Sequence, residues 1–339
     1  MQYKTYQITE SYSVAGLNLV KKDQPKLGPN EVLIKMKAWS LNYRDLLVIK
    51  GIDAWKPPVG RIPVSDGVGV IVETGSEVTS LVVDDRVAGL FFPNWIDGKM
   101  TDAKLTNPLG GKVRDGLLQE YVVLNENELI KVPAFLTDVE AATLPCAALT
   151  AWHGLMEKGQ IQPGNIVLIQ GTGGVSLFSV QFALMAGAEV ILLSGSDEKL
   201  QMVGQMGVNH LINYKRFPNW EDRIMDITNG LGVDHVVEVV GGDHINKSID
   251  AVALDGTISI IGLINGFKGN INTAKIMSRQ VKLQGINVGS KEMFNRMNKA
   301  LEIYNIRPVI DKVFAFEEAK EALTLLESAS HFGKLCISV

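Results

Sequence analysis

The chain has 339 residues, of which 46% are apolar and 21% are charged, and its formal net charge is −4. At roughly 150 residues per domain this length predicts about two folded units, and the composition excludes a disordered, collagen-like or coiled-coil protein. Positive and negative residues are nearly balanced, and the sequence contains no dense basic run. Both features argue against a nucleic acid or an acidic membrane as partner. We therefore expect a small-molecule ligand.

The sequence shows no sign of membrane insertion, secretion or disulfide bonding. No stretch reaches the roughly 18 consecutive apolar residues of a membrane span, and the first residues lack the apolar segment of a secretory signal. Cys146 and Cys336 are too few for a disulfide framework and lack the paired spacing of a structural zinc site. We expect a cytoplasmic protein with reduced thiols.

The first 120 residues contain short strand-like segments separated by turns. Residues 31–38 alternate with a period of two, and the run 67–73 leads to a turn at Gly75. This pattern predicts an irregular β domain.

From about Pro163 onward, apolar runs of four to six residues alternate with helical stretches, as in a parallel sheet covered on both faces. The expected strands are 165–170, 189–193, 234–239 and 256–261, and the expected helices are near 174–187, 197–206, 219–229 and 243–253. A further strand at 282–287, helices near 291–305 and 317–328 and a final strand at 334–338 follow. This order predicts βαβ winding, with the last 50 or so residues returning to the first domain and a ligand cleft between the two units.

A glycine-rich turn follows the first of these expected strands. It reads Gly171, Thr172, Gly173, Gly174, Val175, Ser176, and an amphipathic helix follows it. In this context Gly171 would permit the tight turn, Gly173 would let the backbone approach a pyrophosphate, and the helix N-terminus would attract the anion. Ser176 stands where the dinucleotide-binding pattern has a third glycine. The alternative is a turn of the same shape with no ligand.

The next expected strand ends without the Asp or Glu that selects unphosphorylated NAD. Ser194 and Ser196 can instead donate to a 2′-phosphate, Lys199 can neutralise it, and Tyr214 in the following turn adds a donor. We therefore expect NADP(H), with NAD(H) the alternative if Asp197 or Glu198 reaches the ribose.

Four segments outside the turn carry a family resemblance. They are Ser40-Leu-Asn-Tyr-Arg-Asp45, Pro63-Val-Ser-Asp-Gly-Val-Gly-Val70, Leu144-Pro-Cys-Ala-Ala-Leu-Thr-Ala-Trp152 and His331-Phe-Gly-Lys334. With the glycine turn they span nearly the whole chain, and they resemble the medium-chain dehydrogenase/reductase superfamily. The resemblance is to its zinc-independent branch of alcohol-dehydrogenase-like and quinone-oxidoreductase-like proteins.

This resemblance implies an α/β fold, with a Rossmann doubly wound parallel sheet and a GroES-like irregular β domain. The GroES-like catalytic domain would comprise residues 1–124 completed by 266–339, and the nucleotide-binding domain would comprise 125–265. A homodimer or homotetramer is also implied.

Zinc-dependent relatives carry zinc ligands at three positions, of which this chain keeps only the last. They have Cys where Asn42 stands, Gly-His-Glu where residues 65–67 read Ser-Asp-Gly, and Cys at the position of Cys146. One thiol with an amide and a carboxylate makes a poor tetrahedral zinc site. The loop 90–118 contains no Cys, so the four-thiolate structural zinc lobe is also missing. We expect no metal.

Chemistry without a metal needs few side chains, because the nicotinamide carries the hydride. By resemblance, Asn42 lies near the nicotinamide and would donate a hydrogen bond to the substrate or to the cofactor ribose; a loop-capping role is the alternative. Tyr43 would donate a proton to a nascent alkoxide or enolate, unless it is a packing aromatic. Phe91, Phe92, Trp55 and Trp95 are candidates for an apolar substrate wall, with a lid or an interface patch as the alternative.

Further cofactor contacts follow from the resemblance and from the rule that ligands bind at the carboxyl ends of parallel strands. Thr150 would hold the nicotinamide or its ribose. The three loops expected to cover the cofactor contain Val240 and Gly241, Ile261 and Gly262, and Asn287 and Val288.

Together these features predict an NADP(H)-dependent oxidoreductase that transfers hydride to or from a carbonyl, quinone or enone without zinc. The alternatives are an alcohol dehydrogenase that oxidises small alcohols, and a catalytically weak NADPH-binding sensor.

Overall fold

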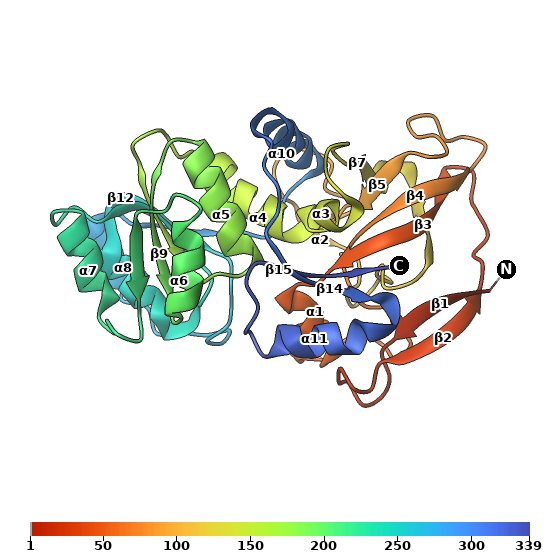
Figure 1. The fold of residues 1–339 in the computed structure, drawn as a ribbon, viewed down its shortest axis with the longest axis horizontal. Helices are drawn as coiled ribbons and strands as arrows, with labels where there is room; N and C mark the ends of the chain where they lie inside the picture. Colours follow the sequence, from red (N-terminus) through yellow and green to blue (C-terminus); the bar gives the residue numbers. More distant parts are fainter. Residues whose placement is uncertain (1) are drawn as a thin grey trace. The chain divides into compact units, whose positions relative to one another are not determined.

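A computed structural model describes residues 2–339, and the chain divides into two compact units (Figure 1). One unit contains the chain up to Leu149 together with Val288–Val339, and the other is Thr150–Asn287. Both divisions fall later in the chain than the boundaries 124/125 and 265/266 that the sequence suggested.

The unit formed by residues 150–287 is built on a six-stranded parallel sheet with strand order β10-β9-β8-β11-β12-β13. In chain order its strands are β8 (Ile166–Gln170), β9 (Glu189–Ser194), β10 (His210–Asn213), β11 (Val233–Glu238), β12 (Val252–Ile260) and β13 (Lys282–Gly285). The order reverses between β8 and β11, as in a doubly wound sheet. The predicted α/β fold class is confirmed for this unit.

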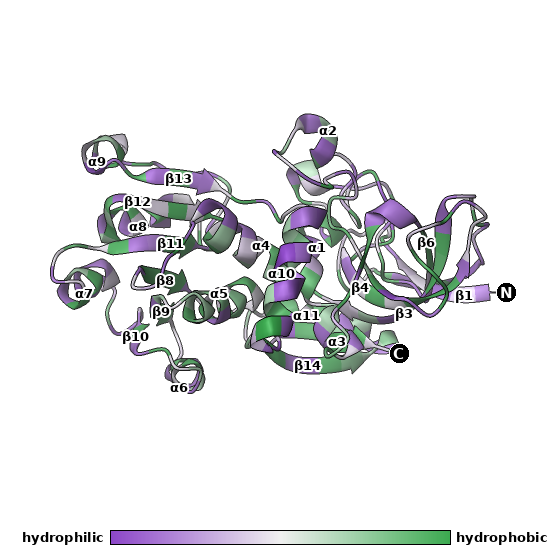
Figure 2. Ribbon diagram, turned by 90° about the horizontal axis from the view of Figure 1, so that it is seen from above, coloured by the Kyte–Doolittle hydropathy of each residue, from purple (hydrophilic) through white to green (hydrophobic). Residues whose placement is uncertain are grey.

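Five helices connect these strands: α5 (Gly174–Met185), α6 (Asp197–Gly204), α7 (Trp220–Ile227), α8 (Ile245–Ala251) and α9 (Thr273–Arg279). Figure 2 shows α5 and α7 on opposite sides of the sheet. The central strand β8 has Val167, Leu168 and Ile169 fully buried, because helices cover both of its faces. That is why such strands read as continuous apolar runs in the sequence.

Helix α9 was not predicted, and its composition explains why. None of its residues is buried, so it has no apolar face from which a helical period could be recognised. Its ends are set locally. Asn272 accepts a hydrogen bond from the Lys275 N–H at 3.1 Å, and Gln280 adopts the left-handed conformation at the C-terminus.

The other unit has a seven-stranded sheet with strand order β14-β15-β3-β4-β5-β7, on which β6 also pairs with β3. These strands are β3 (Glu31–Ser40), β4 (Asp66–Thr74), β5 (Arg86–Gly89), β6 (Tyr121–Asn125), β7 (Leu129–Lys131), β14 (Ile310–Ala315) and β15 (Lys334–Ser338); β1 (Gln2–Gln7) and β2 (Asn18–Asp23) form a separate hairpin. The last segment of the chain returns to the sheet of its first part, as predicted, because β15 pairs antiparallel with β3.

The remaining helices are α1 (Tyr43–Ile49), α2 (Asp102–Leu105), α3 (Asp138–Ala141), α4 (Leu149–Trp152), α10 (Lys291–Tyr304) and α11 (Ala319–Glu327). Wider π-type turns at Leu144–Ala148 and His153–Lys158 flank α4. In the part of the chain that the structure describes, no helix has both the length and the apolar character needed to span a membrane.

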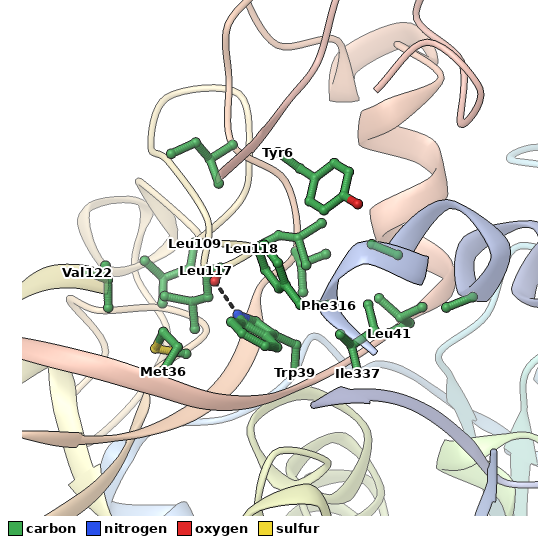
Figure 3. Close-up of a cluster of buried hydrophobic side chains, with 14 of the residues drawn as sticks. Tyr6, Met36, Trp39, Leu41, Leu109, Leu117, Leu118, Val122, Phe316 and Ile337 are labelled. Carbon is green, nitrogen blue, oxygen red and sulfur yellow. Dashed lines mark hydrogen bonds between the residues drawn. The ribbon is translucent and has the colours of Figure 1, made fainter. Parts of the chain in front are cut away.

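An apolar core packed against β3 holds together the unit that is formed by the two ends of the chain (Figure 3). Trp39 is fully buried, its ring centroid lies 4.8 Å from that of Phe316, and its indole N–H donates to the carbonyl of Leu117. Satisfying the indole donor lets the ring stay buried without an orphaned polar group. Residues from both chain ends thus share one core, which fixes the start of β15 close to the end of β3.

Candidate functional site

The glycine turn after β8 has the geometry that a close backbone approach requires. Gly171 has φ +75°, in the left-handed region that favours glycine, and its N–H donates to the carbonyl of Leu193 at 2.7 Å. Gly173 is the N-cap of α5, and a Cβ built on it would meet no atom within 4 Å. The turn therefore presents open space at the N-terminus of a 12-residue helix.

Ser176 has a definite role at the position where a third glycine was expected. The side chain is 2% exposed, and its hydroxyl donates to the carbonyl of Gln170 at 2.7 Å. The hydroxymethyl group thus ties the first turn of α5 to the end of β8. Thr172 between the two glycines is also buried.

The turn after β9 gathers the residues expected to select the coenzyme. The Ser194 hydroxyl accepts from the Ser196 N–H, and the Ser196 hydroxyl accepts from the Lys199 N–H, both at 3.3 Å. Neither bond uses a hydroxyl hydrogen, so both side chains keep a donor. Tyr214 is 44% exposed, and a Cβ on Gly195 would come within 2.7 Å of its phenolic oxygen.

Asp197, the alternative ribose ligand, is held by other groups. Its carboxylate accepts from the Asn213 amide at 2.8 Å and is ion-paired with Arg216. Sequence reasoning missed Arg216, because its pairing joins the turn after β10 to the first residue of α6, 19 positions earlier in the chain. Basic side chains thus border this turn, and the carboxylate of Asp197 is already paired with Arg216.

Glu238 organises the loop after β11, and the sequence reasoning did not identify it either. The side chain is fully buried, and one carboxylate oxygen accepts from the N–H groups of Val240 at 2.8 Å and Gly241 at 3.0 Å. The other oxygen accepts from Gln170 at 2.8 Å and from Ser248. Burial alone would raise the pKa of Glu238, but hydrogen bonds, including one from His244, hold it below its usual value.

The loop after β12 packs directly against the loop after β11. The N–H groups of Ile261 and Gly262 donate to the Glu238 carbonyl at 2.9 and 3.2 Å. A Cβ on Gly262 would lie 1.8 Å from the carbonyl oxygen of Val239, so only glycine fits there. Because their N–H groups are used internally, these two loops offer a ligand mainly their carbonyl groups and side chains.

In the other unit, Asn42 lies in a buried polar cluster at the start of α1. It is 8% exposed, and its carbonyl oxygen Oδ1 accepts from the Lys334 ammonium at 2.6 Å. Lys334 is itself 3% exposed and also donates to the carbonyl of Leu41. Asp45 accepts from the Asn42 backbone N–H at 2.8 Å, and its second oxygen lies 3.3 Å from the Arg44 guanidinium.

Asp66 and Cys146 complete the cluster. The Cys146 backbone N–H donates to one oxygen of the buried Asp66 at 3.1 Å, and the Ser65 hydroxyl donates to the other at 2.8 Å. Burial raises the pKa of Asp66 to about 6, although the nearby charge of Lys334 opposes the rise. Burial and then the charge of Asp66 raise the pKa of the Cys146 thiol, so the thiol stays protonated. Cys146 is thus no activated nucleophile.

The remaining candidates differ in exposure. Tyr43, the first residue of α1, is 47% exposed, whereas Thr150 in α4 is 4% exposed. Asn287 is exposed, and Val288 is buried with φ +49°. The aromatic side chains proposed as a substrate wall are largely buried, and Arg44 lies over the rings of Phe91 and Trp55, at 5.1 and 5.8 Å from their centroids.

Comparison with known proteins places this arrangement in a family. Residues 28–134 match the alcohol dehydrogenase GroES-like domain, and residues 174–303 match the zinc-binding dehydrogenase domain. A zinc-type alcohol dehydrogenase-like protein of Schizosaccharomyces pombe is 43% identical over an alignment 336 residues long, which covers 96% of this chain and 97% of that protein. The chain belongs to the medium-chain dehydrogenase/reductase superfamily.

Solved structures of the superfamily agree. A protein of Sinorhizobium meliloti 1021 described as an alcohol dehydrogenase is 36% identical, with a TM-score of 0.94 over 100% of this chain and 99% of that chain. An NAD-dependent alcohol dehydrogenase has 30% identity and a TM-score of 0.89, covering 99% of both chains. A quinone oxidoreductase from Coxiella burnetii has 27% identity and a TM-score of 0.81, covering 100% of both. The chain is therefore an oxidoreductase of the alcohol dehydrogenase and quinone oxidoreductase type.

Members of this superfamily use a nicotinamide dinucleotide, and the glycine turn fits one. The space over Gly173 is where a Cβ would stand, and the helix behind it directs N–H groups and the positive end of its dipole toward that space. The residues that would hold the dinucleotide are those of the turn, the Ser194–Tyr214 region and the loops after β11 and β12.

Zinc does not fit the residues that occupy its place. An ammonium contacts the amide at the first ligand position, and an aspartate and a single thiol stand at the others, whereas a zinc site needs several thiolate or imidazole ligands that converge. Over residues 2–339 no cluster of three or more His, Cys, Asp or Glu side chains is arranged to hold a metal. The superfamily's zinc therefore has no evident place among these residues.

Proposed function

We propose that this chain is an NADP(H)-dependent, zinc-independent oxidoreductase that transfers hydride to or from a carbonyl, quinone or enone. The observation that carries the proposal is the open glycine turn, in which Gly171 has φ +75° and a Cβ on Gly173 would meet nothing within 4 Å. When bound, a nicotinamide dinucleotide supplies or accepts the hydride. The protein's own residues then bind the coenzyme, orient the substrate and supply hydrogen bonds and protons.

The test of coenzyme binding is Gly173→Ala. The added methyl group touches nothing in the folded chain, so the Tm should change by no more than about 2 °C, whereas the pyrophosphate loses its approach and the Kd for NADPH should rise at least about tenfold. Isothermal titration calorimetry measures the Kd for NADPH of the wild type and of the variant. Wild-type protein that binds neither NADPH nor NADH would refute the proposal.

The preference for NADP(H) is supported by the donors at Ser194 and Ser196, the charge of Lys199 and the engagement of Asp197 by Arg216. A 2′-phosphate needs donors and positive charge, while a ribose hydroxyl pair needs a free carboxylate. Dissociation constants for NADPH and NADH decide between them, and tighter binding of NADH would contradict this part of the proposal.

Asn42 and Tyr43 are proposed to act on the substrate. The Asn42 amide would donate to the substrate oxygen or to the cofactor ribose, and the exposed Tyr43 hydroxyl would donate the proton that balances hydride addition. Asn42→Ala and Tyr43→Phe should each lower kcat at least about tenfold with a nearly unchanged Kd for NADPH. Unchanged turnover in both variants would remove these two assignments.

The substrate class requires a direct assay. NADPH consumption with quinones, enones and aldehydes tests reduction, and NADP+ reduction with small primary and secondary alcohols tests the alternative that the relatives' alcohol dehydrogenase descriptions favour. Coenzyme binding without turnover on either panel would instead indicate a sensor. Metal analysis of the purified protein is the matching test of zinc independence, and one zinc per chain would contradict it.

We also propose a homodimer or homotetramer, as the family resemblance implied, and a cytoplasmic location, as expected from the sequence. Light scattering coupled to size-exclusion chromatography measures the assembly, and a monomer at micromolar concentration would contradict it. Microscopy of a tagged full-length chain tests the location.

A further inference from the structure

Arg44, the second residue of α1, is buried to a degree that is unusual for an arginine. Its side chain is 9% exposed, and a single guanidinium nitrogen, Nη1, makes its hydrogen bonds. Nη1 donates to the carbonyls of Leu109 at 3.0 Å and Gly110 at 3.1 Å, and it lies 3.3 Å from a carboxylate oxygen of Asp45. A guanidinium carries five N–H donors, so the three on Nε and Nη2 remain to be accounted for.

Nε and Nη2 form the unpaired edge of this guanidinium. Both atoms are buried, and no oxygen of the described residues accepts a hydrogen bond from either; Arg44 is the one described arginine of which this holds. Buried donors on a charged group are costly when unpaired, so they are normally satisfied. A Cβ on Gly111 would lie 3.5 Å from Nη2, so the glycine places no side chain beside this nitrogen. The unpaired edge therefore lacks an acceptor within the described chain.

Arg86 shows which group the same edge of an arginine binds elsewhere in this unit. Its Nε and Nη2 lie 2.9 and 2.8 Å from one carboxylate oxygen of Asp138. The N–H groups on this edge of a guanidinium are parallel, which is why carboxylates and phosphates fit it. At Arg44 the corresponding carboxylate has to come from a molecule that the chain binds.

Two aromatic rings lie against the Arg44 guanidinium. Its central carbon is 5.1 Å from the ring centroid of Phe91 and 5.8 Å from that of Trp55. The sequence suggested both rings as part of an apolar substrate wall, but the structure places a permanent positive charge against them. Hydrogen bonds from a charged group are stronger in such surroundings than in water, because little solvent screens them. An apolar ligand would leave Nε and Nη2 unpaired, whereas a carboxylate would pair with both.

We propose that the unpaired edge of Arg44 binds a carboxylate group of the substrate. Arg44 directly follows Asn42 and Tyr43, which are proposed to act on the substrate, so the three residues occupy adjacent positions at the start of α1. The substrate is then a carbonyl compound or enone that also carries a carboxylate. Arg44 binds and orients it and takes no part in the transfer of hydride. The carboxylate site stands on the contacts of Arg44 alone, whereas its assignment to the substrate rests on the proposed function.

Entry of the carboxylate requires the side chain of Trp55 to move. Nε and Nη2 are enclosed by protein, and Trp55 is the neighbouring ring with the weaker support, because it is half-buried and lies in the three-residue turn Asp53–Trp55, in which no residue is buried. Phe91, in contrast, is 5% exposed and is flanked by buried residues on both sides. Trp55 is therefore the movable cover of the site, and Phe91 is its fixed wall.

Binding of benzoate tests the site without any activity measurement. Arg44→Lys keeps the positive charge and donors for the carbonyls of Leu109 and Gly110, but it lacks the parallel edge. Isothermal titration calorimetry should show that this variant binds benzoate at least about tenfold more weakly than wild type. Arg86→Lys is the matched control and should change the Kd by less than about twofold, because Asp138 already occupies the edge of Arg86. Wild-type protein that binds no benzoate, or equal Kd values for wild type and Arg44→Lys, would overturn the proposal.

Three further titrations separate a carboxylate of the substrate from other ligands. Methyl benzoate keeps the ring but has no charge and should bind at least about tenfold more weakly than benzoate; equal binding would mean that the rings hold the probe. Inorganic phosphate that binds as tightly as benzoate would overturn the choice of a carboxylate. The Kd for NADPH should be the same in wild type and Arg44→Lys, and a loss of affinity like that for benzoate would assign the edge to the coenzyme instead.

A measurement on the wild type keeps the site testable if Arg44→Lys folds poorly. In proton–nitrogen NMR spectra, benzoate should shift one arginine Nε–H signal, because that group gains an acceptor, and should leave the other Nε–H signals in place. A titration that singles out no Nε–H signal would overturn the proposal.

Turnover tests the substrate class. NADPH consumption is measured with para-carboxybenzaldehyde, an aldehyde, and acetylacrylate, an enone, each compared with its methyl ester. Wild type should have at least about tenfold higher kcat/KM for the acid than for the ester in at least one pair, and Arg44→Lys should reduce this preference at least about fivefold, mainly by raising the KM for the acid. No preference for either acid would overturn the assignment to the substrate. If wild-type protein turns over no substrate of any kind, the proposed function fails, and the benzoate titration still decides the carboxylate site.

Discussion

Glu238 illustrates how one buried carboxylate can shape a whole loop. Its hydrogen-bond partners include two backbone N–H groups, of Val240 and Gly241, and two side chains, of Gln170 and Ser248. An ionised carboxylate is an acceptor only and can satisfy all four donors at once. An amide cannot, because its NH2 group would face donors.

Glu238→Gln should therefore loosen the loop after β11. The amide nitrogen would oppose either the two N–H groups or the side chains of Gln170 and Ser248, leaving buried donors unpaired at about 1 to 3 kcal/mol. We expect a lower Tm and, since this loop contributes to coenzyme binding in the proposed function, a several-fold higher Kd for NADPH. Glu189→Gln, which alters an exposed pair with His210, is the control and should change neither value. Equal behaviour of the two variants would show that Glu238 does not organise the loop.

The same scale shows what the sequence could and could not reveal. Gly171 and Gly173 were recognisable because their roles depend on neighbours in the chain. Lys334 contacts Asn42, 292 residues away, and Arg216 pairs with Asp197, 19 residues away, and no local pattern encodes either pairing. The closing segment that contains Lys334 supported the family resemblance, but its charge gained meaning only once β15 was paired with β3.

At the scale of elements, the two loops at the ends of β11 and β12 depend on one glycine. The carbonyl of Val239 approaches Gly262 so closely that a methyl group at that position would lie 1.8 Å from it. The loops carry Val240, Gly241 and Ile261, all of them predicted cofactor contacts. Their shape should therefore be sensitive to the smallest possible substitution.

Gly262→Ala should lower both stability and coenzyme affinity. Relieving the clash requires the two loops to separate, which costs about 1 to 3 kcal/mol of overpacking and displaces the predicted contacts. Differential scanning calorimetry and NADPH titration measure the two effects. Gly285→Ala is the matched control, because a Cβ on Gly285, at the end of β13, would meet nothing within 4 Å. A Gly262→Ala protein as stable as the control would contradict the packing argument.

Most elements of the nucleotide-binding unit could be predicted from the sequence, since buried parallel strands and amphipathic helices leave strong periodic signals. The predicted strand at 165–170 corresponds to Ile166–Gln170, and the predicted helix near 174–187 corresponds to Gly174–Met185. The π-type turns around α4 left no such signal, because a local widening of a helix barely changes which residues are apolar.

At the scale of the whole molecule, the division of the chain follows strand pairing. Residues after 124 still belong to the first unit, because β7 pairs with β5. Residues after 265 remain in the second unit, because β13 pairs with β12. The sequence did not reveal these pairings, since β7 and β13 are short and their partners are distant in the chain.

The two units also contain buried titratable groups with opposite effects on stability. The folded state holds the Asp66 pKa at about 6, above the ordinary 3.8, so the folded chain binds the proton more tightly and stability falls as the pH rises through this range. Asp66→Asn removes the effect. Its free energy of unfolding, relative to wild type, should increase by about 2 to 3 kcal/mol between pH 4 and pH 7. Urea denaturation at a series of pH values measures this, and a constant difference would contradict it.

His235 should act in the opposite direction. It is 1% exposed, its Nε2 lies 3.0 Å from the Ser259 hydroxyl, and burial lowers its pKa from 6.5 to about 4. The unfolded chain therefore binds the proton more tightly, and wild-type stability is lost as the pH falls from 6.5 to 4. His235→Gln has no imidazole to protonate and does not show this loss. Its free energy of unfolding should be lower than that of wild type at pH 7, and this difference should be smaller by about 3 kcal/mol at pH 4. Urea denaturation of wild type and His235→Gln at pH 7 and pH 4 measures this difference. A deficit of His235→Gln that stays the same at both pH values would mean that the imidazole is not buried in its neutral form.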